Sequence, residues 1–197
     1  MESCDVVVIG GGPAGSTAAA LLARKGRRVV LLEKDAHPRF HIGESLLPAN
    51  MPLFEELGVA GEIGAIGMQK YGATFVSPWH DHTTSFRFAE ATDPNLPLAY
   101  QVRRSEFDEI LFRRARALGA EAYENTRVRD FTLGSRRELP TVKATSIDGT
   151  VREWQPKFIL DATGRDTLVA NRLKVKRRNK AHNSSAMYGH FRNARRE

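Results

Sequence analysis

The chain has 197 residues, 41% of them hydrophobic, which is enough for one packed domain, or for one domain and part of a second, and excludes global disorder. Its single cysteine, Cys4, excludes an internal disulfide framework and a zinc site built on cysteines. The net charge of +7 is a local feature: residues 172–197 hold nine Lys or Arg and one Glu, against 21 basic and 22 acidic residues in the rest. We interpret this basic end as a solvated segment and expect no nucleic-acid partner, because no zinc-finger or RNP-type motif accompanies it.

No stretch of the sequence is apolar for long enough to cross a membrane. The run at residues 6–9 is far shorter than the apolar core of a signal peptide or a spanning helix. We therefore expect a cytoplasmic protein without a membrane partner.

The first third of the chain has the pattern of a βαβ unit. Residues 4–10 (CDVVVIG) form a short β-branched run, typical of a buried parallel strand. Residues 14–25 are rich in helix formers and end before Gly26, and residues 28–33 (RVVLLE) predict a second buried strand. A helix at 46–57 ends at Gly58.

The later elements continue an α/β pattern. Strands are expected at 69–78 and 83–88, then a helix ended by Gly119, whose apolar face carries Phe107, Ile110, Leu111, Ala115 and Leu118. Residues 142–154 predict a hairpin around Asp148-Gly149, a pair that type I′ turns prefer. A buried strand at 157–164 and a last strand at 185–192 complete the prediction.

A glycine pattern joins the first strand to the first helix. Gly10, Gly12 and Gly15 follow the spacing G-x-G-x-x-G. The first glycine permits a tight turn, the second lets a pyrophosphate approach the backbone, and the third lets the helix pack closely on the strands. The helix N-terminus then offers free N–H donors to the phosphates.

An acidic residue stands where such a site needs one. Glu33 ends the second predicted strand, eighteen residues after Gly15. There a carboxylate accepts hydrogen bonds from a ribose 2′-hydroxyl and repels a 2′-phosphate. The pattern therefore predicts FAD or NAD rather than NADP, the alternative being a glycine-rich turn without a ligand.

Four segments resemble one family. Residues 6–19 (VVVIGGGPAGSTAA), 31–48 (LLEKDAHPRFHIGESLLP), 100–115 (YQVRRSEFDEILFRRA) and 158–165 (FILDATGR) are similar to flavin-dependent halogenases, within the FAD monooxygenases and reductases related to p-hydroxybenzoate hydroxylase. The string RFHIGESLLP points to the branch that acts on phenols and pyrroles. The resemblance implies FAD as the cofactor and a loop after Glu33 that runs along it.

The resemblance also implies the cofactor contacts. Together with the glycine pattern, it predicts as cofactor-binding residues Gly10, Gly12, Pro13, Ala14, Gly15, Ser16, Glu33, Lys34, Arg39, Gly43, Ser45, Gln101, Arg104, Val128, Asp161 and Gly164. Two of these have structural alternatives: Arg104 as a helix residue paired with Asp108, and Asp161 as the cap of a strand-to-helix turn. We prefer a structural role for His41, and an exposed turn rather than a metal site for His80 and His82.

Lys70 is the predicted catalytic residue, by its match to the lysine of the halogenases. In that mechanism reduced flavin and oxygen convert a halide to hypohalous acid, which the lysine holds or captures as a haloamine and delivers to the substrate. A desolvated amine is nucleophilic, and its cation polarises an O–Cl bond. The alternative is a surface lysine at the start of a strand.

The expected architecture is α/β: a Rossmann-like βαβ FAD-binding domain with a parallel sheet and inserted antiparallel strands, truncated before most of the substrate domain. We expect the FAD-binding domain at 1–175, with an insert at 68–100 toward the substrate side, and the start of an incomplete substrate domain at 181–197. The family's later G-W-x-W-x-I-P and G-D-A segments are missing from this sequence.

Three interpretations remain open. The first is the FAD-binding part of a halogenase, which implies a separate flavin reductase, a halide ion and an aromatic or carrier-bound substrate. The second is a flavin monooxygenase or reductase without halide chemistry. The third is a catalytically silent nucleotide-binding module. Self-association through the apolar surface at the truncated edge is a further expectation.

Overall fold

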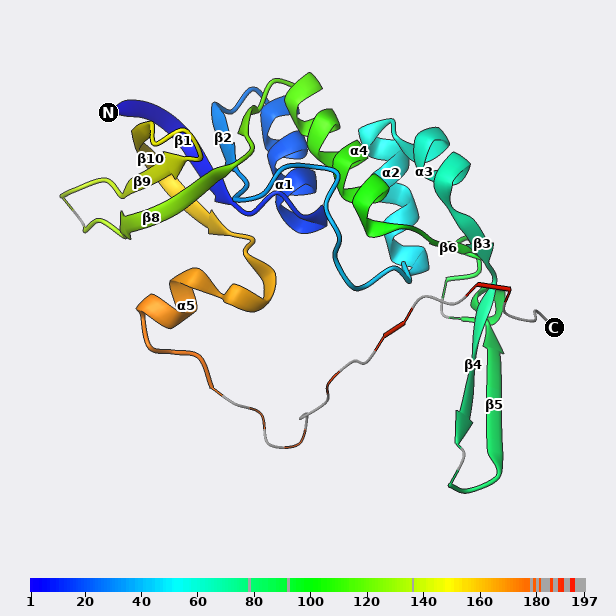
Figure 1. Ribbon diagram of the computed structural model, residues 1–197. Coiled ribbons are helices and arrows are strands. Elements are labelled where there is room, and N and C mark those ends of the chain that lie inside the picture. The colour runs from blue at the N-terminus through cyan, green and yellow to red at the C-terminus, as the bar shows by residue number, and fades with distance from the viewer. Residues whose placement is uncertain are drawn as a thin grey trace.

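The structure is a computed structural model that describes residues 1–77, 79–91, 93–135 and 137–177, and the isolated positions 179, 181, 185, 188, 189, 192 and 193. Its strands are β1 (Glu2–Ile9), β2 (Val29–Leu32), β3 (Met68–Lys70), β4 (Gly72–Ser77), β5 (His82–Arg87), β6 (Ala99–Gln101), β7 (Glu121–Tyr123), β8 (Thr126–Thr132), β9 (Thr141–Ser146) and β10 (Val151–Asp161). Its α-helices are α1 (Pro13–Arg24), α2 (Met51–Leu57), α3 (Ala60–Ile66), α4 (Arg104–Ala117) and α5 (Leu168–Arg172), and short 3-10 turns lie at Pro48–Asn50, Phe88–Glu90 and Gly164–Asp166. Figure 1 shows this arrangement.

A six-stranded sheet in the order β7-β2-β1-β10-β9-β8 organises the fold. The strands β7, β2, β1 and β10 are parallel, and β9 and β8 continue the sheet antiparallel from β10. Val6 pairs with Val29 on one side and with Phe158 on the other, so β1 is a central strand. The predicted α/β fold with a parallel βαβ unit is confirmed.

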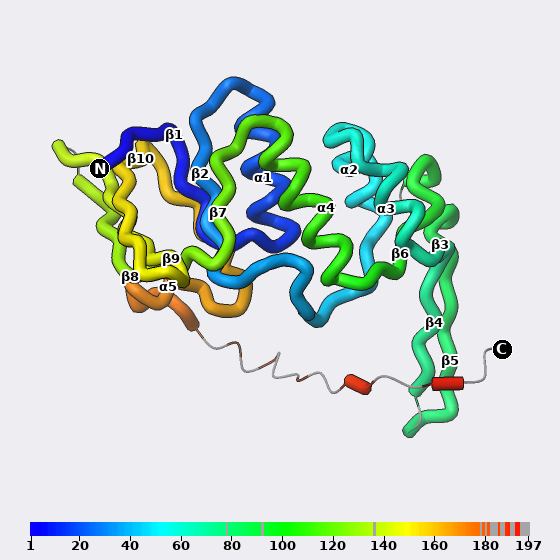
Figure 2. The backbone as a smooth tube through the Cα atoms, turned by 45° about the horizontal axis from the view of Figure 1, so that its top comes forward, coloured from blue at the N-terminus to red at the C-terminus, as the bar shows by residue number. Residues whose placement is uncertain are grey.

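Helices α1 and α4 lie side by side on one face of this sheet (Figure 1, Figure 2). The period-2 alternation of β1 sends Val6 and Val8 to this face, where they join the buried apolar faces of the two helices. Val7 and Ile9 point to the opposite face and pack in a second cluster with Trp154. The predicted helix face on α4 is confirmed at its buried residues Phe107, Ile110, Leu111 and Ala115, and Leu118 is partly buried.

Two local expectations were wrong. The hairpin predicted at 142–154 is confirmed, because β9 and β10 pair antiparallel. Its turn, however, is not type I′: Gly149 has a φ of +84°, but Asp148 does not share the left-handed conformation that type I′ needs at both central residues. Instead, the Gly149 N–H donates to Ser146 O at 3.0 Å and the Ser146 N–H donates to Thr150 O at 2.9 Å, which closes a wider loop.

The other wrong expectation is a fully buried strand at 157–164. Phe158 is 68% exposed and Leu160 is 39% exposed. Both share the sheet face of their partners Val6 and Val8, but α1 covers β1 and β2 rather than β10. The described part of the chain therefore leaves this strip of β10 uncovered.

The segment between α2 and α4 carries the inserted antiparallel strands. The strands β3 and β6 pair with each other, and β4 and β5 form a hairpin that projects away from the main sheet (Figure 1, Figure 2). The helix expected at 46–57 appears as a 3-10 turn followed by α2, and Gly58, with a φ of +69°, ends it as expected.

The predicted strand at 185–192 includes residues 186, 187, 190 and 191, which lie outside the described residues. Within the described residues, no helix combines the length and the apolar character needed to cross a membrane.

Candidate cofactor site

A cleft of about 690 Å³ opens at the carboxyl ends of β1, β2 and β10. In parallel α/β sheets, ligands bind outside these strand ends. The cleft is lined by Ile9, Gly10, Gly12, Pro13, Ala14, Leu32, Glu33, Lys34, Asp35, Arg39, Phe40, His41, Arg104, Thr126, Arg127, Val128, Ala162, Thr163, Gly164, Arg165, Asp166 and Leu168. Ten of the sixteen predicted cofactor-binding residues are among them.

The glycine loop connects β1 to α1, and Gly10 and Gly12 line the cleft. Gly10 has a φ of +109°, and a Cβ there would lie 2.4 Å from the Ala162 carbonyl oxygen. A Cβ on Gly15 would lie 1.9 Å from the Gly10 carbonyl oxygen, so this glycine is required for packing rather than for lining the cleft. Gly12 is different, because its nearest neighbour would be Arg39 Nη2 at 3.8 Å. An added side chain at Gly12 would point into open cleft space.

The N-terminus of α1 faces this space. Gly12 is the N-cap and carries no side-chain cap, and Pro13 and Ala14 also line the cleft. The first N–H groups of the helix and its dipole are therefore available to an anion. Ser16 is fully buried and its hydroxyl donates to Gly11 O at 3.1 Å, so this side chain stabilises the glycine turn and does not face the cleft.

Glu33 is buried at the end of β2 and braces the glycine loop. Its Oε2 accepts the Gly11 N–H at 2.7 Å, and its Oε1 accepts the Asp35 N–H at 3.0 Å. Burial raises the pKa of Glu33, but the Arg39 cation and these two backbone hydrogen bonds outweigh it and hold the pKa below its ordinary value. Glu33 is thus an ionised carboxylate at the position expected for a ribose partner.

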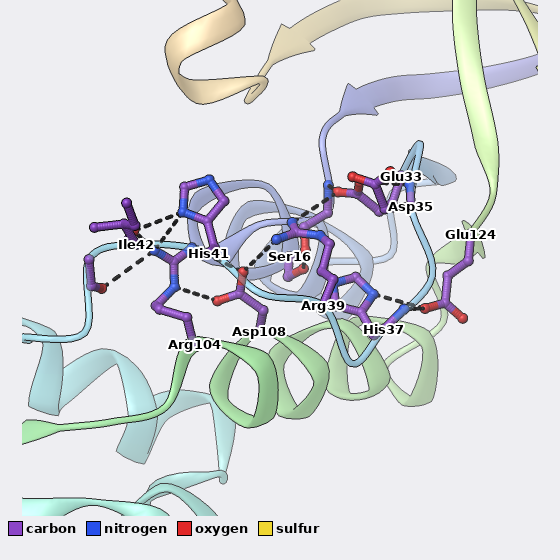
Figure 3. A network of polar contacts seen from close by, with 12 residues as sticks. Ser16, Glu33, Asp35, His37, Arg39, His41, Ile42, Arg104, Asp108 and Glu124 are labelled. Atoms are coloured by element: carbon purple, nitrogen blue, oxygen red, sulfur yellow. Dashed lines mark hydrogen bonds and ion pairs between the residues drawn. The ribbon is translucent and has the colours of Figure 1, made fainter. Parts of the chain in front are cut away.

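A chain of alternating charges runs from Glu33 along the cleft (Figure 3). Arg39 Nη2 lies 3.2 Å from Glu33 Oε2, and Arg39 Nη1 lies 3.2 Å from Asp108 Oδ2. Arg104 holds the same Asp108 in a two-bond fork, with Nε–Oδ1 at 2.7 Å and Nη2–Oδ2 at 3.0 Å. Arg104 thus pairs with Asp108, as expected if its role is structural. It also lines the cleft, where a cofactor contact would place it.

The 39–46 loop continues from Arg39 past the cleft. Arg104 Nη1 donates to Ile42 O at 2.9 Å, and Gly43 has a φ of +110°. Farther on, Ser45 forms a bridge with Gln101, and the Val102 N–H donates to Glu44 O at 2.9 Å. Ser45 therefore attaches this loop to Gln101 of β6, whereas Gly43 lies next to Arg104, and none of the three lines the cleft.

The opposite end of the cleft is built from β8 and the turn after β10. Val128 and Gly164 line this end, and Lys34 Nζ lies 2.9 Å from Asp166 Oδ2. The lining residues that the sequence did not predict are Ile9, Leu32, Asp35, Phe40, His41, Thr126, Arg127, Ala162, Thr163, Arg165, Asp166 and Leu168. Four of them lie at strand ends: Ile9 and Leu32 end β1 and β2, Thr126 begins β8, and Ala162 directly follows β10.

Asp161 caps the turn that follows β10, which was the structural alternative to its predicted cofactor contact. Its Oδ1 accepts the Thr163 N–H at 3.0 Å, and its Oδ2 accepts the Val169 N–H at 2.7 Å. Asp161 does not line the cleft. Its carboxylate fixes the turn that carries Thr163 and Gly164 to the cleft wall.

Lys70 stands at the far end of the 39–46 loop. Its Nζ donates to Leu46 O at 2.7 Å and to the Ser45 hydroxyl, and it lies 5.5 Å from the centre of the Phe88 ring. It is half-buried, which differs from a freely solvated surface lysine.

The histidines of the β4–β5 hairpin face their own strands and turn. His80 Nδ1 lies 3.0 Å from Ser77 Oγ, and His82 Nε2 lies 2.9 Å from Thr84 Oγ1. In the described part of the chain, no three His, Cys, Asp or Glu side chains gather closely enough to hold a metal ion. His41 Nδ1 lies 2.8 Å from Ile42 O, at the Arg104 end of the cleft.

The geometry fits a dinucleotide. A glycine at position 12 leaves room for a pyrophosphate against the α1 N-terminus, two arginines lie beside it, and a buried carboxylate occupies the ribose end. Residues 3–193 match the family model described as "FAD binding domain". The chain belongs to this family. Its cofactor is FAD.

The similar proteins are flavin enzymes. The chain is 38% identical to the flavin-dependent halogenase rdc2 of Metacordyceps chlamydosporia, over 98% of this chain and 38% of that protein. It is 31% identical to the 1H-pyrrole-2-carbonyl-[peptidyl-carrier protein] chlorinase of Pseudomonas fluorescens, over 96% of this chain and 45% of that protein.

Among solved structures, the myxobacterial chondrochloren halogenase CndH superposes with a TM-score of 0.77 at 37% identity, covering 85% of this chain and 39% of that one. The chain thus spans about two fifths of the length of the relatives that it matches.

Proposed function

We propose that this chain forms the FAD-binding part of a flavin-dependent halogenase. The observation that carries the proposal is the attachment of Lys70 to the 39–46 loop, through Leu46 O at 2.7 Å and the Ser45 hydroxyl. This loop lines the cofactor cleft from Arg39 to His41 and then leaves it, so it joins the cofactor site to the lysine. The similarity to rdc2 and to CndH supports the same conclusion.

The chain's own residues would divide the work along the cleft. Glu33, the glycine loop, the N-terminus of α1 and Arg39 would bind the ribose and the pyrophosphate, and Arg104 would add positive charge toward the flavin end. When bound and reduced, FAD would supply two of the four electrons that oxygen takes up, and the halide would supply the other two as it is oxidised to hypohalous acid. Most of these contacts are with the adenosine-diphosphate half of FAD, so this half would contribute most of the free energy of FAD binding to this chain.

Lys70 would hold the oxidised halogen. A protonated lysine has three N–H donors, and Leu46 O and the Ser45 hydroxyl accept two of them. The third is left for the oxygen of hypohalous acid, and the cation polarises the O–halogen bond so that an electron-rich ring attacks the halogen. The Phe88 ring beside Nζ shields one side of the amine from water.

The remaining partners follow from this chemistry. Reduced flavin comes from a separate reductase, a halide ion is consumed, and the acceptor is an aromatic compound, either free or on a carrier protein. The carrier alternative is supported by the similarity to the pyrrole chlorinase, whose name specifies a carrier-bound pyrrole.

The test replaces Lys70 with methionine in the protein that contains this chain. Halide-dependent product formation from phenols and pyrroles is measured with chemically reduced FAD, alongside FAD binding. We expect Lys70→Met to lower halogenation by at least about a hundredfold, because the delivering group is lost, and to leave FAD affinity within about twofold. The matched control is Lys143→Met, which replaces an exposed lysine of β9 that pairs with Glu153 of β10, and it should change neither quantity.

Two results would contradict the proposal. Halogenation that survives Lys70→Met removes Lys70 from the chemistry. Product formation that does not depend on halide, in the unaltered protein, identifies a monooxygenase or reductase instead.

A further inference from the structure

Asp108 is a buried charge to which neither the fold nor the proposed chemistry assigns a task. It lies on α4 and its side chain is 0% exposed. Three hydrogen bonds reach its two oxygens, two from Arg104 and one from Arg39, and both arginines line the cofactor cleft. Asp108 itself does not line the cleft.

The two arginines depend on Asp108 to different degrees. Arg39 is also held by Glu33 Oε2 at 3.2 Å, so it keeps an anionic partner without Asp108. Arg104 has Asp108 as its carboxylate partner in the described structure, and their planar groups meet in a two-bond fork. Such a fork fixes the orientation of a guanidinium group much more strongly than a single contact does.

The oriented Arg104 in turn holds the 39–46 loop. Its Nη1 donates to Ile42 O at 2.9 Å and lies 3.4 Å from Gly43 O and 3.3 Å from His41 Nδ1. These contacts continue the charge chain that begins at Glu33 (Figure 3). This row of charged side chains therefore spans the cleft from Glu33 to the 39–46 loop, whose far end contacts Lys70.

We propose that Asp108 is a positioning residue that couples the two ends of the FAD site by orienting Arg104 against the 39–46 loop. The inference rests on the proposed placement of FAD in this cleft, but not on halide chemistry. It assigns Asp108 no contact with the cofactor. Its action passes through Arg104, so the flavin half of FAD should sense its loss while the adenosine-diphosphate half keeps Glu33, the glycine loop and Arg39.

The experiment compares ADP with FAD as probes of the purified chain. In Asp108→Asn, we expect FAD to bind about tenfold more weakly, because the fork that fixes Arg104 loses its charge and one acceptor, and we expect ADP affinity to stay within about twofold. Glu106→Gln is the matched control: it removes a carboxylate from the same helix, one that pairs with the exposed Arg103 at 2.9 Å, and should change neither affinity.

A second variant keeps the test valid if Asp108→Asn does not fold. Arg104→Gln leaves Asp108 paired with Arg39, and it should reproduce the selective loss of FAD affinity. Where both variants fold, the double variant should bind FAD no more weakly than the weaker of the two single variants, because both remove one link.

Several outcomes would overturn the inference. These are equal losses of ADP and FAD affinity in Asp108→Asn, unchanged FAD affinity in either variant, or losses that add in the double variant. If the unaltered chain binds neither ADP nor FAD, the placement of the cofactor fails as well, which distinguishes that failure from an error about Asp108 alone.

Discussion

Replacement of Glu33 by glutamine tests the cofactor site at its most connected residue. The carboxylate accepts the Gly11 N–H at 2.7 Å and the Asp35 N–H at 3.0 Å, and it pairs with Arg39 at 3.2 Å. Glutamine has one acceptor oxygen, so its NH₂ group must face one of these donors. A buried donor left without an acceptor costs about 1–3 kcal/mol, and Arg39 also loses one of its two anionic partners.

The expected effects on folding and binding are separable. We expect the free energy of unfolding to fall by about 2–4 kcal/mol, from the lost acceptor and the weakened ion pair. The charge-assisted bond to a ribose hydroxyl is worth about 1.5–3 kcal/mol, so the Kd for FAD should rise roughly ten- to hundredfold. Flavin fluorescence titration at a temperature where both proteins are folded measures the binding, and denaturant unfolding measures the stability.

The matched control is Asp35→Asn. Asp35 lines the same end of the cleft but is exposed, so its substitution should change stability by less than about 0.5 kcal/mol and FAD affinity by less than about threefold. A folded Glu33→Gln protein that binds FAD within twofold of the unaltered chain would refute the assignment of Glu33 to the ribose.

Two further predictions concern pH and the glycine loop. The folded-state pKa of Glu33 lies below its ordinary value of 4.5, so the stabilisation from its ionised form is present above pH 4.5 and is lost as the pH falls through the folded pKa. On acidification, the free energy of unfolding should therefore fall further in the unaltered chain than in Glu33→Gln. Parallel pH profiles of the two proteins would contradict this. Gly12→Ala should leave the melting temperature nearly unchanged, because a Cβ has open space there, and should weaken FAD binding at least about tenfold by filling the pyrophosphate position. Gly15→Ala should instead destabilise the fold, because its Cβ would lie 1.9 Å from Gly10 O. If Gly12→Ala binds FAD as tightly as the unaltered chain, the pyrophosphate does not lie against this loop.

The parts of the site that sequence predicts well are local. The glycine spacing and Glu33 belong to one βαβ unit, and each residue type has a backbone or hydrogen-bonding reason at its own position. Their geometry follows once the two strands and the helix form. The helix face on α4 was predictable for the same reason, since its apolar period of 3.6 residues needs no knowledge of the partner.

The parts that sequence missed depend on distant segments. Asp108 becomes the shared partner of Arg39 and Arg104 only after α4 packs beside α1 and brings residues 39 and 108 together. The exposure of Phe158 is likewise set by which strands α1 covers, and strand composition carries no information on that. The sequence pattern at Asp161 fits both a cofactor contact and a cap of the strand-to-helix turn. Only its hydrogen bonds with Thr163 and Val169 distinguish the two roles.

The most direct test of the account is a titration of the purified, cofactor-free chain with FAD, followed by flavin fluorescence, with NAD as the competitor. We predict saturable binding of FAD, most of whose binding energy ADP reproduces, and weaker binding of NAD, which shares the adenosine-diphosphate half but lacks the flavin. A folded chain that binds NAD as well as FAD, or binds neither, would contradict the assignment of this cleft to FAD.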